Sequence, residues 1–139
     1  MFNGPLRYVD GDGLKVTFLG SGTNIEALKG AYKLVGSTKR GKQLCEILEK
    51  SPKDFKIRAD QPQAWFDPKT NTINVDPNFH PEIETAAGKQ KATTDVILGH
   101  EMGHAATGTK DDGDGNMNNV KQNENPIRKE LGYPPRTKY

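Results

Sequence analysis

Three residues able to bind a metal ion or move a proton, His100, Glu101 and His104, lie in the stretch TTDVILGHEMGHAATGTKDDGDG (residues 93–115). In a helix of 3.6 residues per turn, positions i and i+4 share one face, so both imidazoles can point toward one metal ion. Zinc lowers the pKa of a bound water to about 7, and a glutamate beside the first histidine can accept the proton that this water releases. The spacing therefore indicates one catalytic Zn2+ bound by His100 and His104, with Glu101 as the general base.

The same spacing can also arise by chance on an ordinary amphipathic helix. Two of the 3 histidines of the chain fall in this motif, which argues against chance. The opposite helix face carries Leu98, Met102 and Ala105, which suit a hydrophobic core. Small residues adjoin the histidines, namely Gly99, Gly103, Ala105 and Ala106. One side of the helix can therefore pack while the other side faces a cleft.

The third ligand must come from outside the motif, because catalytic zinc keeps three protein ligands and one open position. Position 110, where the metzincin pattern places this ligand, is a lysine. Asp111 and Asp112 in the segment GTKDD are candidates, but this segment begins only four residues after His104 and leaves little chain for a separate element. Glu124 lies 20 residues after His104, beyond a connector rich in Gly, Asp and Asn that can reverse the chain direction. We predict Glu124 as the third ligand.

Further candidates lie elsewhere in the chain. Glu130, one to two helical turns beyond Glu124, is the alternative third ligand, and His80 is a candidate fourth ligand or proton donor. Attack of a zinc-activated water on a carbonyl also needs a donor for the developing oxyanion. Tyr139, Arg136 and Arg128 are the candidates because they are close in sequence to Glu124, and we assign Tyr139 as the catalytic one. For Arg128 and Arg136, the alternative is a structural role in which they tie the C-terminal tail to the fold.

Two helices are expected to position these residues. The first spans about 94–106, and Gly108 lies just beyond its end. The second spans about 118–131, is interrupted or restarted at Pro126, and ends at Gly132.

The remaining elements follow from periodicity and turn residues. Helices are predicted over 23–35, with a stripe of Ile25, Leu28, Tyr32 and Val35, and over 38–50, with a buried face of Leu44, Ile47 and Leu48. Strands are predicted as a hairpin over 5–19 that turns at Asp10–Gly13, short strands at 55–58 and 63–66, and a hairpin that turns at Asp67–Asn71 into Thr72–Val75. Residues 76–92 are predicted to be loop.

Composition limits the class of protein. A chain of 139 residues suggests a single domain, 1–139, and 32% apolar residues with 15 Gly and 9 Pro favour a small α+β domain with much loop. The net charge of +2 is too small to favour a nucleic-acid partner. One cysteine excludes an internal disulfide bond. The sequence contains no apolar run of about 20 residues and no basic and apolar leader, so neither a membrane anchor nor a secretory signal is expected.

The HExxH segment and the C-terminal tail together resemble a known family. LGHEMGHA followed by ENPIRKELGYPPRTKY resembles the NleD-like effector zinc metallopeptidases, which occur as bacterial secreted effectors and as toxin domains of Rhs-type polymorphic toxins. The residues that match in the tail are Glu124, Asn125, Ile127, Arg128, Leu131, Gly132, Pro134, Arg136 and Tyr139. The strand NTINVDP is also similar, and the likeness is specific over about 94–139.

The resemblance implies a minimal zincin-like domain in which a small antiparallel or mixed sheet packs on the HExxH helix and a C-terminal helix supplies the third ligand. It supports Glu124 in that role. In zincins the substrate lies extended along an edge strand, and Thr72–Val75 is the candidate strand, with Ile73, Asn74 and Val75 as substrate-binding residues.

These observations together predict a zinc-dependent endopeptidase that acts as a secreted bacterial effector or toxin and cleaves proteins in a target cell. The alternative is a non-catalytic, zinc-stabilised interaction domain, which a fourth protein ligand such as His80 or Asp112 would favour. We expect a monomer that meets a protein substrate, and possibly a cognate immunity protein, without a nucleic-acid or membrane partner. Without a leader, export is expected through a specialised secretion system, with action in the target-cell cytoplasm.

Overall fold

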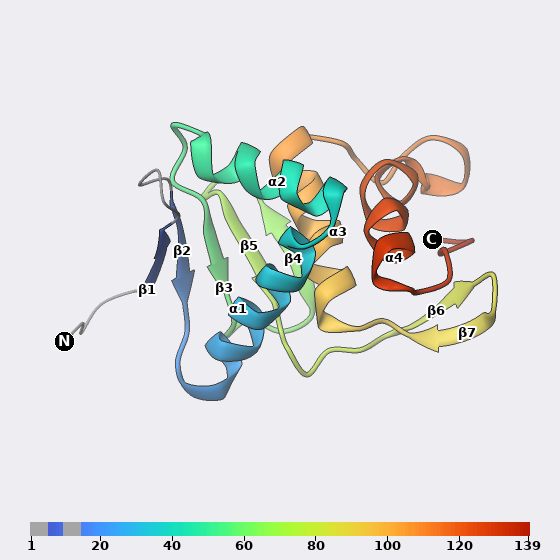
Figure 1. The fold of residues 1–139 in the computed structure, drawn as a ribbon, viewed down its shortest axis with the longest axis horizontal. Helices are drawn as coiled ribbons and strands as arrows, with labels where there is room; N and C mark the ends of the chain where they lie inside the picture. The colour runs from blue at the N-terminus through green and yellow to red at the C-terminus, as the bar shows by residue number, and fades with distance from the viewer. Residues whose placement is uncertain (1–5, 10–14) are drawn as a thin grey trace.

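A five-stranded sheet in the order β1-β2-β3-β5-β4 is the platform of the fold (Figure 1). The computed structural model describes residues 6–9 and 15–139. The strands are β1 (Leu6–Val9), β2 (Lys15–Leu19), β3 (Lys56–Arg58), β4 (Ala64–Asp67) and β5 (Thr72–Val75). β2, β3 and β5 run parallel, whereas β1 and β4 pair antiparallel at the two edges. Both predicted hairpins are confirmed by this pairing, although the turn at 10–13 lies outside the described residues.

Helices α1 (Gly22–Gly36) and α2 (Lys39–Lys50) lie across one face of the sheet (Figure 1). Helix α3 (Thr94–Thr107) packs against both of them and against β4 and β5. The large apolar side chains that the core buries completely come from the sheet, from these three helices and, with Ile127, from the segment after α3: Phe18, Leu28, Leu44, Leu48, Ile57, Ile73, Leu98, Met102 and Ile127. The predicted α+β architecture, with a small mixed sheet on the HExxH helix, is confirmed.

The apolar stripe predicted for α1 is buried throughout, but the buried face of α2 differs from its prediction. Ile47 is 42% exposed, whereas Cys45 and Glu49 turn inward beside Leu44 and Leu48. The buried Glu49 carboxylate accepts a hydrogen bond from the Tyr32 hydroxyl at 2.6 Å. This contact gives the buried carboxylate a hydrogen-bond partner, which allows Glu49 to lie on the inward face of α2.

The prediction of loop over 76–92 is wrong for its second half. β6 (Glu82–Thr85) and β7 (Gly88–Lys91) form an antiparallel hairpin. All four residues of β7 are exposed and polar or glycine, so the strand has no apolar alternation to reveal it. The C-terminal tail pairs with this hairpin, because the Thr137 N–H donates to the Glu84 carbonyl at 3.0 Å and the Ala86 N–H donates to the Pro135 carbonyl at 3.0 Å.

The segment after α3 carries a short 3-10 turn, η1 (Asp114–Asn116), a π-helical turn, η2 (Val120–Glu124), and α4 (Asn125–Leu131). Proline lacks an N–H and clashes with the carbonyl four residues earlier in a regular α-helix. The wide turn of η2 directly precedes Pro126, which stands in the first turn of α4. Gly132 ends α4 in the left-handed conformation at φ 83°. The predicted restart at Pro126 and stop at Gly132 are both confirmed.

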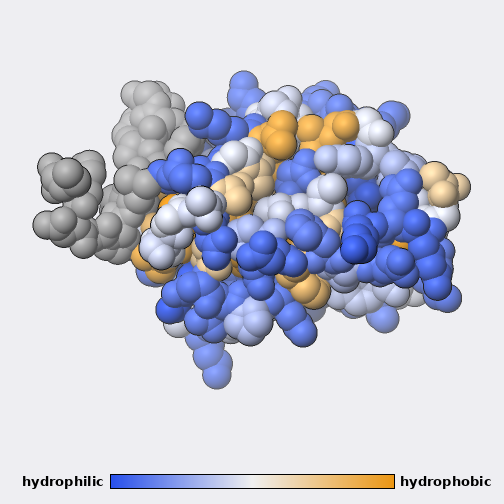
Figure 2. Space-filling view, turned by 90° about the horizontal axis from the view of Figure 1, so that it is seen from below, coloured by the Kyte–Doolittle hydropathy of each residue, from blue (hydrophilic) through white to orange (hydrophobic). Residues whose placement is uncertain are grey.

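Figure 2 shows one face of the molecule, where hydrophilic residues predominate and the apolar patches are small and separate. This surface agrees with the low apolar content and the mean hydropathy of −0.82. Among the described residues, no helix is both long enough and apolar enough to cross a membrane.

Candidate metal centre

Helix α3 presents the HExxH residues from a well-defined frame. Its N-cap residue Thr93 is extended, and Asp95 lies in the first turn, where a negative charge suits the helix dipole. Almost the whole of Asp95–Gly103 is buried, because the sheet and the helices α1 and α2 enclose it. Gly108 ends the helix in the left-handed conformation at φ 70°, and its N–H donates to the His104 carbonyl at 3.0 Å. This turn sends the chain back toward the histidines.

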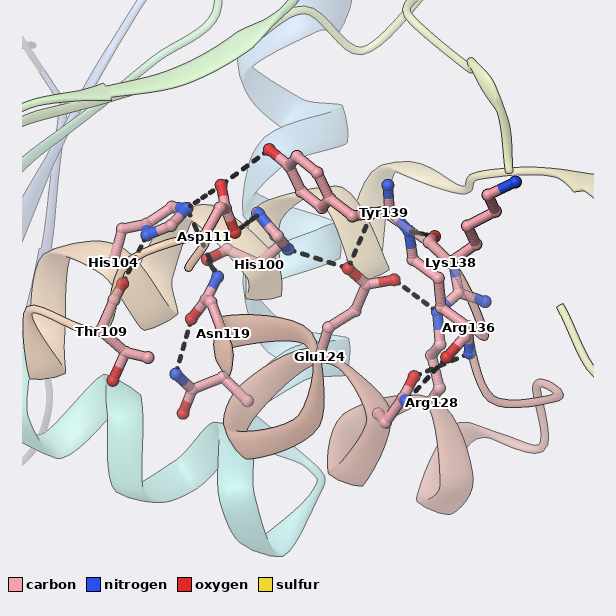
Figure 3. Close-up of polar contacts among 12 residues, drawn as sticks. His100, His104, Thr109, Asp111, Asn119, Glu124, Arg128, Arg136, Lys138 and Tyr139 are labelled. Carbon is pink, nitrogen blue, oxygen red and sulfur yellow. Dashed lines mark hydrogen bonds and ion pairs between the residues drawn. The ribbon is translucent and has the colours of Figure 1, made fainter. Parts of the chain in front are cut away.

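The returning loop brings Asp111 between the two imidazoles (Figure 3). Asp111 Oδ2 lies 2.9 Å from His104 Nε2, and Oδ1 lies 3.2 Å from His100 Nε2. One ligand atom from each of the three residues falls within 4.8 Å of the other two. Within the described part of the chain, this is the group of His, Cys, Asp and Glu side chains that could hold a metal ion.

Glu124, the predicted third ligand, lies at the other nitrogen of His100. The His100 Nδ1–H donates to Glu124 Oε1 at 2.8 Å, so this carboxylate does not join the Nε2 cluster. His104 is held in the same way, because its Nδ1–H donates to the Thr109 carbonyl at 2.6 Å. Metal-binding histidines usually have the second ring nitrogen fixed by a carboxylate or a carbonyl. The geometry thus favours Asp111 as the third ligand and Glu124 as the residue that orients His100.

Two arginines keep Glu124 ionised in a buried position (Figure 3). Arg128 Nε donates to Glu124 Oε2 at 2.6 Å, and Arg136 Nη1 donates to Oε1 at 3.2 Å. Burial alone would raise the pKa of Glu124, but the contacts with His100, Arg136 and Arg128 lower it overall. The arginines that were candidates for oxyanion binding are therefore engaged in holding this carboxylate, as the structural alternative proposed.

The other candidate ligands lie away from the cluster. Glu130 accepts hydrogen bonds from the Lys39 N–H at the start of α2, at 2.9 and 3.0 Å. Asp112 accepts from the Asn118 side chain at 2.7 Å. His80 is exposed and its Nδ1 lies 2.9 Å from the Ala92 carbonyl oxygen, to which it donates. The structure brings none of them to His100 and His104.

The protonation pattern of the cluster fits a bound cation. Both Nδ1 atoms are donors, so a neutral imidazole presents its Nε2 lone pair directly toward the Asp111 carboxylate. Two acceptors at this distance repel each other unless a proton or a metal ion lies between them. Asp111 Oδ1 is also buried, and no polar group of the described residues other than the His100 ring, at 3.2 Å, reaches it. Two imidazole nitrogens and one carboxylate oxygen are a typical ligand set for catalytic zinc.

Electrostatics in the metal-free cluster follow the same pattern. Burial lowers the pKa of His100, but hydrogen bonds to Asp111 and Glu124 outweigh it and raise this pKa to about 9. Burial raises the pKa of Asp111, but hydrogen bonds from His100 and Tyr139 lower it to about 2. Without a metal ion, a proton on His100 therefore offsets the negative charge of the two carboxylates, and a divalent ion that binds here would displace this proton.

Glu101 and Tyr139 complete the site. Glu101 is 8% exposed, and burial raises the pKa of its carboxyl group above the ordinary value. The Tyr139 hydroxyl donates to Asp111 Oδ2 at 2.7 Å, and its ring stacks on His100 with centroids 6.2 Å apart. The pairing of the tail with β6 and the hydrogen bonds between Asn125 and the backbone of Arg136 hold this tyrosine near the cluster.

Two pockets meet at Glu101 and Tyr139. The hairpin pocket, about 250 Å³, is lined by Ala64, Phe79, Pro81, Glu82, Ile83, Ala92, Val96, Ile97, His100, Glu101, Glu124, Arg136 and Tyr139. The tryptophan pocket, about 560 Å³, is lined by Ala64, Trp65, Phe66, Pro68, Glu101, His104, Gly108, Thr109, Lys110, Asp111 and Tyr139. The metal-binding cluster thus lies in a cleft that continues on both sides.

The strand predicted to bind substrate is not an edge strand. β5, with Ile73, Asn74 and Val75, pairs with β3 on one side and β4 on the other, and all four of its residues are buried. Its backbone is therefore unavailable to a peptide. β4 is the strand at the sheet edge, and its residues line both pockets. The order of strands in a sheet depends on long-range packing, so the local pattern could not distinguish β4 from β5.

Two asparagines that sequence analysis missed anchor the ligand helix. The Asn119 side-chain N–H donates to the His100 carbonyl at 2.9 Å, and Asn123 Nδ2 donates to Asn119 Oδ1 at 2.7 Å. Arg40 of α2 extends the chain of contacts by donating to Asn123 Oδ1 at 2.9 Å. Both asparagines are completely buried. Their i, i+4 spacing on a predicted helix was the available signal.

Gly103 allows this close approach, and Gly103→Ala is expected to destabilise the protein. A Cβ at Gly103 would lie 2.5 Å from Asn119 Oδ1 and 2.7 Å from Asn123 Nδ2. Overpacking of this kind typically costs about 1–3 kcal/mol. Urea denaturation of the metal-free protein measures the loss. Gly30→Ala is the matched control: an added Cβ there meets no described atom within 4 Å, and helix propensity predicts a gain of about 0.5–1 kcal/mol. Equal stability of the two variants would contradict the packing argument.

Comparisons with known proteins agree with the zincin-like fold. Neither the protein-family models nor the curated proteins gave a match. Among solved structures, the chain is similar to the crystal structure of the Salmonella zinc metalloprotease effector GtgA, with a TM-score of 0.56 and 18% identity over 83% of this chain and 67% of that chain. At this identity the likeness concerns the fold, and the resemblance to NleD-like peptidases in particular stays a prediction.

Proposed function

We propose that this chain is a zinc-dependent endopeptidase that acts as a bacterial effector or toxin on a protein in a target cell. The observation that carries the proposal is the convergence of His100 Nε2, His104 Nε2 and the Asp111 carboxylate, with both Nδ1 atoms already engaged. The effector role is supported by the fold shared with a zinc metalloprotease effector.

The residues around the cluster have complementary tasks in this reaction. Zinc bound by His100, His104 and Asp111 would supply a Lewis acid and a water of lowered pKa. Glu101 takes the proton from the attacking water and passes it to the leaving amine. Burial raises the pKa of Glu101, which brings a glutamate closer to the value needed for both steps near neutral pH. Glu124 holds the ring of His100 and fixes its tautomer.

Tyr139 is the proposed donor to the oxyanion, and Tyr139→Phe is expected to lower kcat by about 100- to 1000-fold. The Tyr139 hydroxyl donates to Asp111 Oδ2 beside the cluster, and the side chain lines both pockets. Zinc content and KM should change little, because the aromatic ring that stacks on His100 remains. Steady-state kinetics on a cleaved peptide and metal analysis check both points. An unchanged kcat would assign oxyanion binding to another group.

The alternative is a zinc-stabilised interaction domain without catalysis. Structural zinc sites are closed by a fourth protein ligand. His80 and Asp112, the candidates for that ligand, are engaged by Ala92 and Asn118 instead. The cluster also opens into two pockets, which a structural site does not need. The peptidase is therefore the better supported function.

The test compares active and Glu101→Ala protein expressed in bacteria and in animal cells, followed by proteomic identification of new protein ends. New ends in one cell type that depend on Glu101 identify both the substrate and the target cell. The absence of any Glu101-dependent end in both, with stoichiometric zinc, would favour the interaction domain. The same experiment addresses the proposed protein substrate. A cognate immunity protein that protects the producing cell is the second proposed partner. We propose a monomer that is exported by a specialised secretion system and acts in the target-cell cytoplasm.

A further inference from the structure

We propose that the hairpin pocket selects an apolar side chain on the residue that follows the cleaved bond, with Ile83 and Ile97 as specificity-determining residues. This inference rests on the proposed endopeptidase function and adds the chemistry and the side of the substrate that is recognised.

The walls of the hairpin pocket are mostly apolar and come from separate elements. β6 contributes Ile83, α3 contributes Val96 and Ile97, and the segment before the hairpin contributes Phe79 and Pro81. Ile83, Val96 and Ile97 are 8%, 2% and 8% exposed, so these side chains are held by their surroundings. A volume of about 250 Å³ accommodates a branched aliphatic or single-ring aromatic side chain.

The charged residues in the lining disfavour an acidic substrate side chain, and those deep in the pocket are already engaged. Arg136 and Glu124 are paired with each other at 3.2 Å. Glu101 is assigned to proton transfer. Glu82 is exposed on β6, where its negative charge disfavours an acidic substrate residue. An apolar side chain therefore fits this pocket better than an acidic one, and the buried apolar walls favour it over a basic one, which could meet only the exposed Glu82.

The direction of the substrate follows from β4. In the described part of the chain β4 pairs with β5 alone, so its outer edge is available to an extended peptide. Ala64 lines both pockets, whereas Trp65, Phe66 and Pro68, which follow it, line the tryptophan pocket. A peptide that pairs antiparallel with β4, the more stable pairing, runs from the tryptophan pocket to the hairpin pocket. The residue after the cleaved bond therefore meets Ile83 and Ile97.

The tryptophan pocket has a different character. Trp65 is 44% exposed there, and the exposed Lys110 also lines it. Its larger volume and mixed lining predict a weaker selection for the residue before the cleaved bond. The two sides of the bond should therefore differ in stringency.

The experiment digests a random decapeptide mixture with zinc-loaded protein of the full 139 residues and identifies the new ends by mass spectrometry. We expect Leu, Ile, Met or Phe after the cleaved bond, enriched about tenfold or more over Asp and Glu. Ile97→Ala should shift the preference toward larger aromatic residues. Ile83→Glu should shift it toward Lys and Arg, whereas Ile47→Glu, at an exposed position on α2, should not change it.

A binding measurement separates failure of this inference from failure of the proposed function. Two short peptide hydroxamates, one with an isobutyl and one with a carboxymethyl side chain, are titrated into zinc-loaded protein. Tighter binding of the isobutyl compound, lost in Ile83→Glu and weakened in Ile97→Ala, supports the pocket assignment even if no decapeptide is cleaved. Equal binding of both compounds, or a preference confined to the residue before the cleaved bond, would overturn it. Zinc-loaded protein that cleaves nothing but binds the isobutyl compound selectively counts against the peptidase alone.

Discussion

Replacing Glu101 with glutamine is expected to reduce peptide hydrolysis by about 100- to 10,000-fold while zinc remains bound. Glutamine keeps the size of the side chain but cannot accept the proton. Glu101 is 8% exposed and lies in the sequence between two residues of α3 that are buried, so its position is fixed by the helix. It takes no part in the cluster of His100, His104 and Asp111, and metal binding should therefore survive.

The pH dependence of kcat/KM should also follow from the ionisation of Glu101. Burial is the main cause that raises the pKa of Glu101. A base acts in its ionised form, so the acidic limb of kcat/KM should lie above the ordinary pKa of a glutamate in the wild-type protein. Glu101→Gln should lose this limb together with the activity.

The measurement combines steady-state kinetics, metal analysis and circular dichroism for three proteins: wild type, Glu101→Gln and Glu46→Gln. Glu46 is a matched control, because its side chain is 49% exposed on α2. Full activity of Glu101→Gln would show that another group is the general base. Loss of zinc from this variant would instead assign Glu101 a role in holding the metal site.

Local signals in the sequence were sufficient to predict the helices whose ends are set by their own residues. The helix of the HExxH motif has a buried apolar face and Gly108 just beyond its end, and both signals were correct, although Thr93 at the N-cap makes no side-chain capping hydrogen bond. The restart of the helix at Pro126 could also be predicted, because proline cannot donate a helical hydrogen bond in any fold. For these elements the positions where the helix begins or ends follow from neighbouring residues alone.

Non-local contacts explain what could not be predicted. β7 has no buried face, so its own residues do not predict a strand. The contact of the hairpin with the C-terminal tail, which pairs with β6, is a long-range feature that the local sequence does not show. The edge position of β4 depends on the order in which strands associate. The choice between Asp111 and Glu124 depends on the left-handed turn at Gly108. This turn brings Asp111 back to the histidines within a few residues, so the third ligand does not need a separate helix or strand.

Asp111→Ala is expected to abolish zinc binding at micromolar metal, whereas Glu124→Gln should weaken it by about 10- to 100-fold. The difference arises because Asp111 lies at both Nε2 atoms, while Glu124 lies at the far nitrogen of His100. Asp112→Ala is the control, since this neighbouring carboxylate is engaged by Asn118 alone among the described contacts.

Stability in the absence of zinc should show the opposite order. Glu124 is 2% exposed, and its loss of charge leaves Arg128, itself 3% exposed, without its ionised partner. Breaking a buried pair in this way typically costs about 3–5 kcal/mol. Asp111 is only partly buried, with 21% of its side chain exposed, so Asp111→Ala should cost less.

These two effects can be separated by measuring urea denaturation with and without zinc. A ligand that binds the folded state stabilises it in proportion to the logarithm of its concentration over Kd. Asp111→Ala should therefore lose the zinc-dependent increase in stability and keep most of the metal-free stability. Glu124→Gln should lose metal-free stability and keep a zinc-dependent increase that is smaller by about 1.4–2.7 kcal/mol. If Glu124→Gln lost the zinc-dependent increase and Asp111→Ala retained it, Glu124 would be the ligand that the sequence first indicated. The cleft would then need to rearrange around His100, because Nδ1 rather than Nε2 faces that carboxylate.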